Sequence, residues 1–165
     1  MNKHLKNGLF WAMPATWMGL IFLSSRMPYD QQDIKPALAS RFDLTVLEPF
    51  FRPVSFTYHQ STISVEALGI ERFVEFLVRK GAHVAVFFVL TLLFVYAFKK
   101  TTDLPLGKVF LYSFLMSVGY ACIDEINQSF TPNRTPYIGD VVLDSVGSLL
   151  AIIGLYVVRL FRKQS

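Results

Sequence analysis

A short polar segment between two apolar runs carries the residues most able to do chemistry in this sequence. The segment covers residues 124–147, and the apolar runs around it cover residues 109–123 and 141–158. Its charged and amide side chains are Asp124, Glu125, Gln128, Arg134, Asp140 and Asp144. If the apolar runs cross a membrane, ionisable side chains at their ends avoid lipid and face protein or water, which marks a functional site.

Two kinds of chemistry fit this segment together with His83. Histidine and carboxylates exchange protons as general acids and bases, and we assign His83, Asp124 and Glu125 as hypothetical catalytic residues. The same groups can instead bind a ligand, because lysine and arginine bind phosphate and carboxylates accept hydrogen bonds. The predicted ligand-binding residues are Lys80, Gln128, Arg134, Asp140 and Asp144.

Structural roles are the alternative for these residues. Asp140 and Asp144 can pair with Arg134 or Lys80 and only stabilise the segment, although intramembrane carboxylates are rarely kept for stability alone. His83 can equally be an interfacial histidine without a chemical role. One histidine among carboxylates is a poor match to a zinc site, whereas carboxylate oxygens suit a hard cation. We assign no metal ligand, and the cofactor is unknown.

The composition indicates an integral membrane protein. Of 165 residues, 53% are hydrophobic and 17% are charged, whereas about a quarter of residues are charged in soluble domains. The net charge is +4, but the bases lie in short clusters beside apolar runs, which is a topology signal and not a nucleic-acid-binding stripe. We therefore expect no nucleic-acid partner. The single cysteine, Cys122, is expected as a small core residue.

Four apolar runs predict an all-α, polytopic membrane protein with a four-helix transmembrane bundle. The expected spans are about 8–25, 81–98, 106–126 and 137–158, within a single domain of residues 1–165. Each approaches the ~20 residues that cross a bilayer. A signal peptide is the alternative for the first run, but that run is longer than usual and lacks a small-residue cleavage pattern. We therefore predict a retained first span.

Residues 26–80 form the long connection between the first two spans. Four prolines between residues 26 and 56 are expected to break any regular element there. Farther on, Ile70, Phe73, Val74 and Leu77 follow helical spacing, which predicts an amphipathic interfacial helix before the second span. A solvated helix packed on the bundle is the alternative.

The distribution of bases predicts the topology. The N-terminus, the connection around residues 99–108 and the C-terminus together hold eight bases and one acid. Short loops rich in lysine and arginine stay in the cytoplasm. We therefore predict a multi-pass protein of the cell membrane with both termini cytoplasmic and residues 26–80 extracytoplasmic.

Helical spacing places the polar residues on inner faces. The third run carries a stripe of Ser113, Ser117, Tyr120, Asp124 and Gln128. The fourth carries Asp140, Asp144, Gly147, Ala151 and Gly154, and such small residues let a neighbouring helix approach closely. We expect both stripes to meet Lys80 and His83 in one outward-facing pocket.

Two motifs in the chain resemble the VanZ-like family of small membrane proteins. Residues 79–83 read RKGAH, which is similar to the family's RK-x-AH motif. Residues 124–147 are similar to its DE-x-x-Q, arginine, DV-x-x-D-x-x-G pattern, with matches at Asp124, Glu125, Gln128, Arg134, Asp140, Val141, Asp144 and Gly147. Ser24 and Ser25 resemble the family's serine pair at the end of the first helix, although Arg26 stands where glutamine is common.

This resemblance covers most of the chain and implies four membrane helices in a cell-envelope setting. The family is named for a protein linked to teicoplanin resistance, a phenotype that members need not share, and it supplies no agreed reaction. We predict a protein that binds a lipid-linked or phosphate-bearing envelope ligand, with membrane lipids and a lipid-linked cell-wall intermediate as expected partners. The alternative is an enzyme on a lipid phosphate that uses His83 and carboxylates as acid and base. A transporter is less favoured, because a chain this short without an inverted repeat would have to oligomerise.

Overall fold

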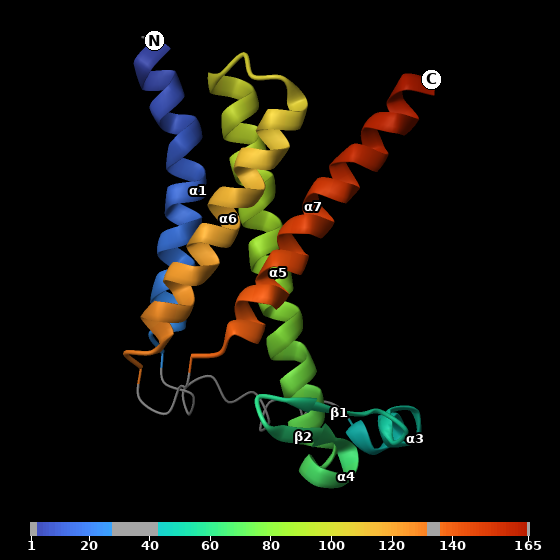
Figure 1. The fold of residues 1–165 in the computed structure, drawn as a ribbon. Coiled ribbons are helices and arrows are strands. Elements are labelled where there is room, and N and C mark those ends of the chain that lie inside the picture. Colours follow the sequence, from blue (N-terminus) through green and yellow to red (C-terminus); the bar gives the residue numbers. More distant parts are fainter. Residues whose placement is uncertain (1–2, 28–42, 132–135, 165) are drawn as a thin grey trace. The chain divides into compact units, whose positions relative to one another are not determined.

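Four long helices dominate the computed structural model, which describes residues 3–27, 43–131 and 136–164 (Figure 1). Each is long and apolar enough to cross a membrane, at 20 to 32 residues. The spans are Lys6–Ser25, Ile70–Thr101, Leu106–Gln128 and Ile138–Arg162. The predicted four-span, all-α membrane architecture is therefore confirmed.

The chain divides into two compact units. The membrane unit comprises residues 1–27 and 83–165, and the small unit comprises residues 28–82. The membrane unit holds α1 (Lys3–Ser25), α6 (Leu106–Gln128) and α7 (Ile138–Gln164). The helix α5 (Ile70–Thr101) contributes its residues from His83 onward to the same unit.

The direction of the helices gives the membrane unit two chemically different ends (Figure 1). At the end called here the polar end, α1 and α6 finish and α7 begins, so Asp124, Glu125 and Asp140 gather there. At the other, the basic end, α1 begins, α5 connects to α6, and α7 finishes. The bases at the basic end include Lys6, Lys99, Lys100, Lys108, Arg159 and Arg162.

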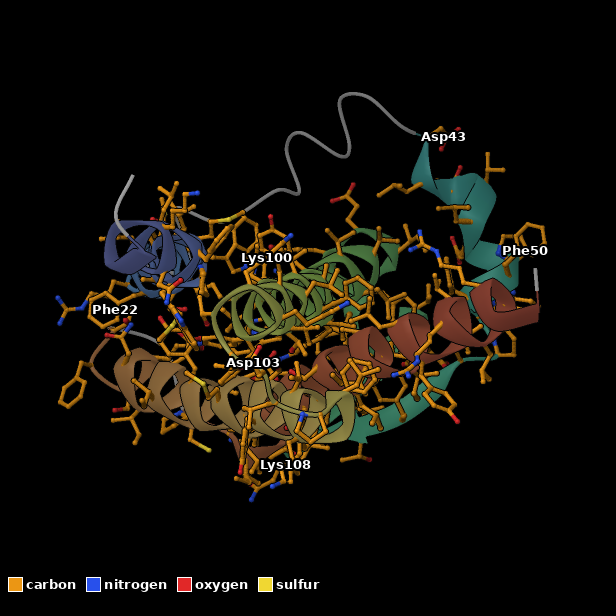
Figure 2. All side chains as sticks on the ribbon, turned by 90° about the horizontal axis from the view of Figure 1, so that it is seen from above. Phe22, Asp43, Phe50, Lys100, Asp103 and Lys108 are labelled. Atoms are coloured by element: carbon orange, nitrogen blue, oxygen red, sulfur yellow. The ribbon has the colours of Figure 1, made fainter. Side chains whose placement is uncertain are left out.

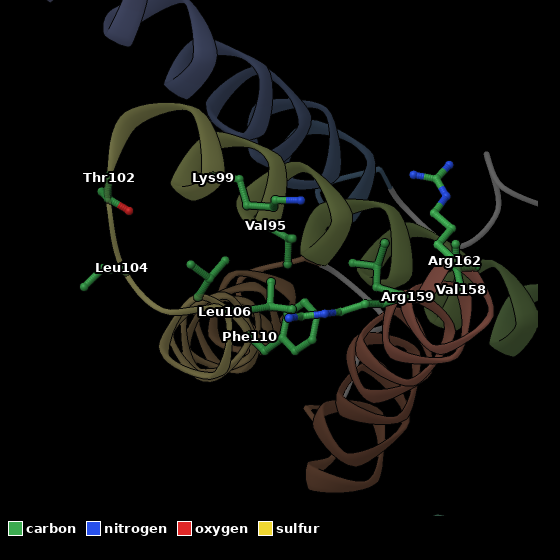
Figure 3. Close-up of a pocket in the computed structure, with 11 residues that line it drawn as sticks. Val95, Lys99, Thr102, Leu104, Leu106, Phe110, Val158, Arg159 and Arg162 are labelled. Atoms are coloured by element: carbon green, nitrogen blue, oxygen red, sulfur yellow. The ribbon is translucent and has the colours of Figure 1, made fainter. Parts of the chain in front are cut away.

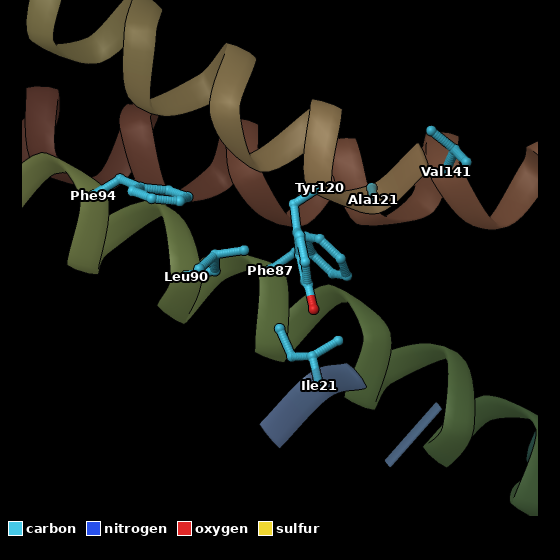
Figure 4. Close-up of a cluster of buried hydrophobic side chains, with 7 residues drawn as sticks. All are labelled: Ile21, Phe87, Leu90, Phe94, Tyr120, Ala121 and Val141. Carbon is cyan, nitrogen blue, oxygen red and sulfur yellow. The ribbon is translucent and has the colours of Figure 1, made fainter. Parts of the chain in front are cut away.

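Aromatic and aliphatic side chains fill the centre of the membrane unit. The buried cluster is Ile21, Phe87, Leu90, Phe94, Tyr120, Ala121 and Val141 (Figure 4). Two aromatic polar groups in this region find backbone acceptors. The Tyr120 hydroxyl donates to the Met18 carbonyl at 2.5 Å, and Trp17 Nε1 donates to the Val86 carbonyl at 2.9 Å. These bonds fix α1 against α6 and α5, because a buried polar group without a partner is costly.

The outer faces of the four spans are apolar and exposed. Leu9 is 62% exposed, Leu115 is 53% exposed and Ile153 is 47% exposed, as expected for side chains that contact lipid. Viewed from above, Phe22 lies at the outer edge of the membrane unit (Figure 2). Cys122 is also exposed on α6, so its expected core position was wrong. Lipid accepts apolar side chains as readily as a protein core does, so hydrophobicity does not distinguish the two faces.

The small unit contains regular structure where the prolines led us to expect none. It holds η2 (Leu44–Leu47), α3 (Glu48–Phe51), the strands β1 (Ser55–Tyr58) and β2 (Ser61–Ser64), and α4 (Val65–Leu68). The prediction of an irregular segment over residues 26–56 was therefore wrong for its described part, which contains η2 and α3. One of the prolines occupies an early position of α3, where its missing N–H is not needed by the helix.

Side-chain hydrogen bonds cap the N-termini of two short helices in the small unit. The hydroxyl and backbone N–H of Thr45 donate to Asp43 at the start of η2. These bonds hold the pKa of the Asp43 carboxyl below its usual value, because they stabilise the charged form. Ser64 accepts a bond from Ala67 N at the start of α4, as expected of a serine that caps a helix.

A two-residue turn joins the antiparallel strands β1 and β2, which pair from Ser55 with Ser64 to Tyr58 with Ser61. The turn residues His59 and Gln60 have φ angles of 46° and 62°. Such a turn usually uses asparagine and glycine, because both positions need positive φ. The sequence therefore lacks the ordinary signal for this hairpin. The buried hydrophobic cluster of the small unit consists of Ile63 from β2, Val65 from α4 and Phe73 from α5.

The helix that contains the second span begins before the expected start of that span. Gly69, with a φ of 78°, separates α4 from α5. From Ile70 the chain is one continuous helix of 32 residues to Thr101. The amphipathic stretch therefore forms the first turns of α5 and is not a separate helix, and the expected span of about 81–98 lies within α5. The change from charged to apolar sequence there marks a change of surroundings and not of backbone conformation.

Candidate functional site

The polar stripe of α6 is buried as its spacing predicted. Ser113 and Ser117 are fully buried, and Tyr120, Asp124 and Gln128 are at most 7% exposed. The Thr91 hydroxyl of α5 donates to Ser117 Oγ at 2.8 Å, which couples the middle of the stripe to a neighbouring helix. The stripe leads to Asp124 near the polar end.

Asp124 is held by two neutral donors. Ser25 Oγ and Gln128 Nε2 each donate to Asp124 Oδ2 at 2.9 Å. The other oxygen, Oδ1, is also buried and has no hydrogen-bond partner within the part of the chain that the structure describes. A buried carboxylate oxygen normally has a partner. Asp124 therefore keeps one acceptor that a ligand donor can use.

Ser25 belongs to this site although it was not among the predicted site residues. It ends α1, is buried at 7% exposure, and reaches Asp124 across 99 positions of sequence. Its own carbonyl accepts a bond from Thr131 Oγ1 at 3.3 Å, and the Phe22 carbonyl accepts from Asn127 Nδ2 at 3.3 Å. The serine pair at residues 24 and 25 was the sequence signal that could have identified it.

A second network pairs His83 of α5 with Asp144 of α7. His83 Nδ1 lies 3.2 Å from Asp144 Oδ1, and Asp144 is only 2% exposed. The contact depends on Gly147, one turn farther along α7. A Cβ atom there would collide with the Val84 carbonyl oxygen, so only glycine permits this approach of α5 and α7. By contrast, a Cβ at Gly154 would meet open space, so the expected small-residue seam does not extend that far.

Glu125 and Asp140 connect the end of α6 to the start of α7. Glu125 Oε1 accepts a hydrogen bond from the backbone N–H of Tyr137, and the Tyr137 carbonyl accepts from Asp140 N at 2.8 Å. Glu125 lies within electrostatic range of His83, Asp124 and Asp140. Asp144 likewise lies within electrostatic range of Asp124 and Asp140. The four carboxylates and the histidine therefore act on one another.

We call this group the polar cluster, and it comprises Ser25, His83, Asp124, Glu125, Gln128, Asp140 and Asp144. Six of the eight predicted site residues thus lie together in the membrane unit. Lys80 belongs to the small unit, where its Nζ lies 4.6 Å from the Tyr58 ring centroid. Arg134 lies outside the described residues. The expected convergence of all eight residues on one outward-facing pocket stays a prediction, as do their functional roles.

The chemistry available to the polar cluster is proton exchange and hydrogen bonding. The imidazole can hold a proton between its ring and Asp144, and Asp124 Oδ1 can accept a donor. Within the described residues, no group of three or more histidine, cysteine or acidic side chains is arranged to hold a metal ion.

Comparison with known proteins supports a family assignment. The model of the VanZ/LLP1 family matches residues 10–161, which is nearly the whole chain and includes the polar cluster. No curated protein and no solved structure matches the chain. The family match agrees with the two sequence motifs and with the four membrane helices. The chain therefore belongs to the VanZ/LLP1 family.

Proposed function

We propose that this protein binds a lipid-linked or phosphate-bearing ligand of the cell envelope at the polar cluster. A lipid-linked cell-wall intermediate is the favoured ligand class, with tolerance to teicoplanin as a phenotype to be tested. In this proposal the protein lies in the cell membrane with both termini in the cytoplasm, because the basic end carries the short, base-rich segments. The polar cluster then faces outward.

The observation that carries the proposal is the unpaired acceptor of Asp124. Ser25 and Gln128 hold the carboxylate through Oδ2 and leave Oδ1 buried without a partner in the described chain. A ligand hydroxyl or amide N–H would satisfy that oxygen. Lys80 and Arg134 are the cations proposed to contact the ligand phosphate.

Catalysis on a lipid phosphate is the second candidate, and the His83–Asp144 pair favours it. A carboxylate at one ring nitrogen fixes the tautomer and orientation of a histidine, and the other ring nitrogen then exchanges the proton. In that case His83 acts as general acid or base. The binding proposal stays first, because proton transfer also needs a nucleophile or an activated water, and no motif for either accompanies the pair.

The substitution Asp124→Asn tests the binding proposal. If the carbonyl of the introduced amide accepts the bonds from Ser25 and Gln128, its NH₂ group occupies the former position of Oδ1 and presents donors where an acceptor is needed. We expect lipid-linked cell-wall intermediates that co-purify with the protein, measured by mass spectrometry, to fall roughly tenfold or more. The matched control is Asp103→Asn, an exposed site at the basic end, which should retain the wild-type amount.

His83→Gln separates the two candidates. Glutamine keeps hydrogen-bonding capacity but cannot act as an acid or base, so it should weaken a binder and abolish an enzyme. Both variants are compared at matched membrane abundance in a deletion strain, with envelope lipids as the readout. Wild-type ligand retention by Asp124→Asn would refute the binding proposal, whereas complete loss of the lipid phenotype in His83→Gln at normal abundance would favour the enzyme.

A further inference from the structure

A pocket of about 490 Å³ opens at the basic end of the membrane unit, far along the helices from the polar cluster. It lies between the end of α5, the start of α6 and the last turns of α7 (Figure 3). The cationic residues that line it are Lys99, Arg159 and Arg162, and the apolar wall includes Val95, Phe110 and Leu155. The described lining contains no acidic side chain.

The positions of these cations need an explanation beyond topology. Bases at the ends of membrane helices keep a loop in the cytoplasm and complement the carbonyl ends of the helices. Lys6, Lys100 and Lys108 lie at the same end and can serve as topology signals, but they do not line the pocket. Lys99 and Arg159 come from different helices, and Figure 3 shows both side chains extending into the space between α5, α6 and α7. Like charges that converge on one cavity repel one another, and an anion would relieve that repulsion.

The apolar wall indicates what kind of anion fits. Phe110 and Leu155 extend the pocket along the helices toward the hydrophobic part of the spans. A volume of about 490 Å³ is in the range of a pocket for an organic ligand and is far larger than one phosphate ion needs. Basic pockets between membrane helices bind the headgroups of anionic lipids through arginine and lysine.

We propose that this pocket binds an anionic phospholipid from the leaflet at the basic end. The lipid phosphate contacts Lys99 and Arg159, with Arg162 one helical turn farther on, and the upper part of an acyl chain lies against Phe110 and Leu155. The site is separate from the polar cluster, so it stands or falls independently of the proposed function.

Lipid retention by the purified full-length protein tests the proposal. The probes are phosphatidylglycerol and, as a zwitterionic match, phosphatidylcholine, each added in mixed micelles and counted by native mass spectrometry. The triple variant Lys99→Gln, Arg159→Gln, Arg162→Gln should lower phosphatidylglycerol affinity roughly tenfold or more and leave phosphatidylcholine unchanged. The control Lys6→Gln, Lys100→Gln, Lys108→Gln removes the same charge from the same end outside the pocket and should change affinity less than about twofold.

A second variant tests the cavity without a change of charge. Leu155→Trp fills the space along the apolar wall and should also reduce phosphatidylglycerol retention. If the triple variant does not fold, the single variant Arg159→Gln replaces it in the affinity measurement. An equal loss in the two triple variants would overturn the proposal, because the effect would then be general charge at the membrane. Displacement of the lipid by millimolar inorganic phosphate, or full retention by Leu155→Trp, would overturn it as well.

Discussion

Asp124 and Asp144 are buried to the same degree, but the protein treats their charges differently. Asp144 pairs with the imidazole of His83, which can carry the balancing proton. Asp124 receives only neutral donors, from Ser25 and Gln128. A charge held by neutral dipoles in a low-dielectric site is more sensitive to the loss of any one of them. The support of Asp124 Oδ2 therefore depends on each of these two hydrogen bonds.

The Ser25–Asp124 bond makes a specific prediction about stability. Ser25→Ala removes one of the two donors to Asp124 Oδ2, and a lost hydrogen bond to a buried charged group costs about 1.5–3 kcal/mol. We expect a reduction of that size in the free energy of unfolding, measured by detergent denaturation of the purified protein. The neighbour Ser24 is exposed, so Ser24→Ala should lower the free energy of unfolding less than Ser25→Ala does.

Equal effects of the two serine variants would contradict the assigned role of Ser25. In that case the observed loss would reflect a general preference for serine at the end of α1. A further check is the double variant Ser25→Ala, Asp124→Asn, because the two effects should be less than additive if the residues interact.

Sequence reasoning identified six of the seven residues of the polar cluster but not how they pair with one another. His83, Asp124 and Asp144 were predicted because charge is rare in apolar helices. Ser25 was missed as a site residue, because a serine at the end of a membrane helix has many uses and its partner lies 99 positions away. The pairing of His83 with Asp144, rather than with another carboxylate, follows from the packing of α5 on α7, which helical spacing alone does not specify.

Among the helices, α5 and α7 can approach closely because residue 147 is a glycine and has no Cβ atom. Gly147 brings the backbone of α7 against the Val84 carbonyl of α5. Asp144 lies one turn before this contact, so the distance from Asp144 to His83 depends on the approach of the two helices. A helix seam in a membrane has no hydrophobic driving force and relies on such close packing.

Two glycine variants test this seam as a matched pair. Gly147→Ala places a Cβ against the Val84 oxygen, closer than van der Waals contact allows, which forces α5 and α7 apart and should lower the free energy of unfolding by roughly 1–3 kcal/mol. Gly154→Ala meets open space and should raise it by up to about 1 kcal/mol, because alanine favours the helix. Detergent denaturation measures both. A wild-type value for Gly147→Ala would show that the two helices do not need this contact.

The elements that the sequence predicted well are those governed by hydrophobic length. Runs of apolar residues with charged ends identified all four spans. The β1–β2 hairpin was missed because His59 and Gln60 are atypical turn residues. The helical spacing of residues 70–77 was recognised, but its continuity with the second span was missed, because the change from charged to apolar sequence near residue 81 resembles a boundary. The actual break is at Gly69.

For the molecule as a whole, the charge asymmetry between the two ends predicts an orientation. In a Cys122→Ser background, a cysteine in place of Gln60 should react with a membrane-impermeant thiol reagent in intact cells. A cysteine in place of Asp103 should react only after permeabilisation, because short connections rich in lysine and arginine are expected on the cytoplasmic side. Both positions are exposed. The opposite labelling pattern would invert the topology and place the polar cluster on the cytoplasmic side.

The bonds between α1 and α6 also bear on how the protein is made. These two are the less apolar of the four spans, and each supplies the polar partners of the other, through Ser25 with Asp124 and Met18 with Tyr120. The partners are separated by 99 and 102 positions, which a ribosome needs about 5–20 s to synthesise. During that interval α1 lies in the membrane before its partners on α6 have been synthesised, although Val86 of α5, the acceptor for Trp17, is made earlier. Membrane quality-control proteases would find their best opportunity in this period, before α6 arrives and closes the helix pair.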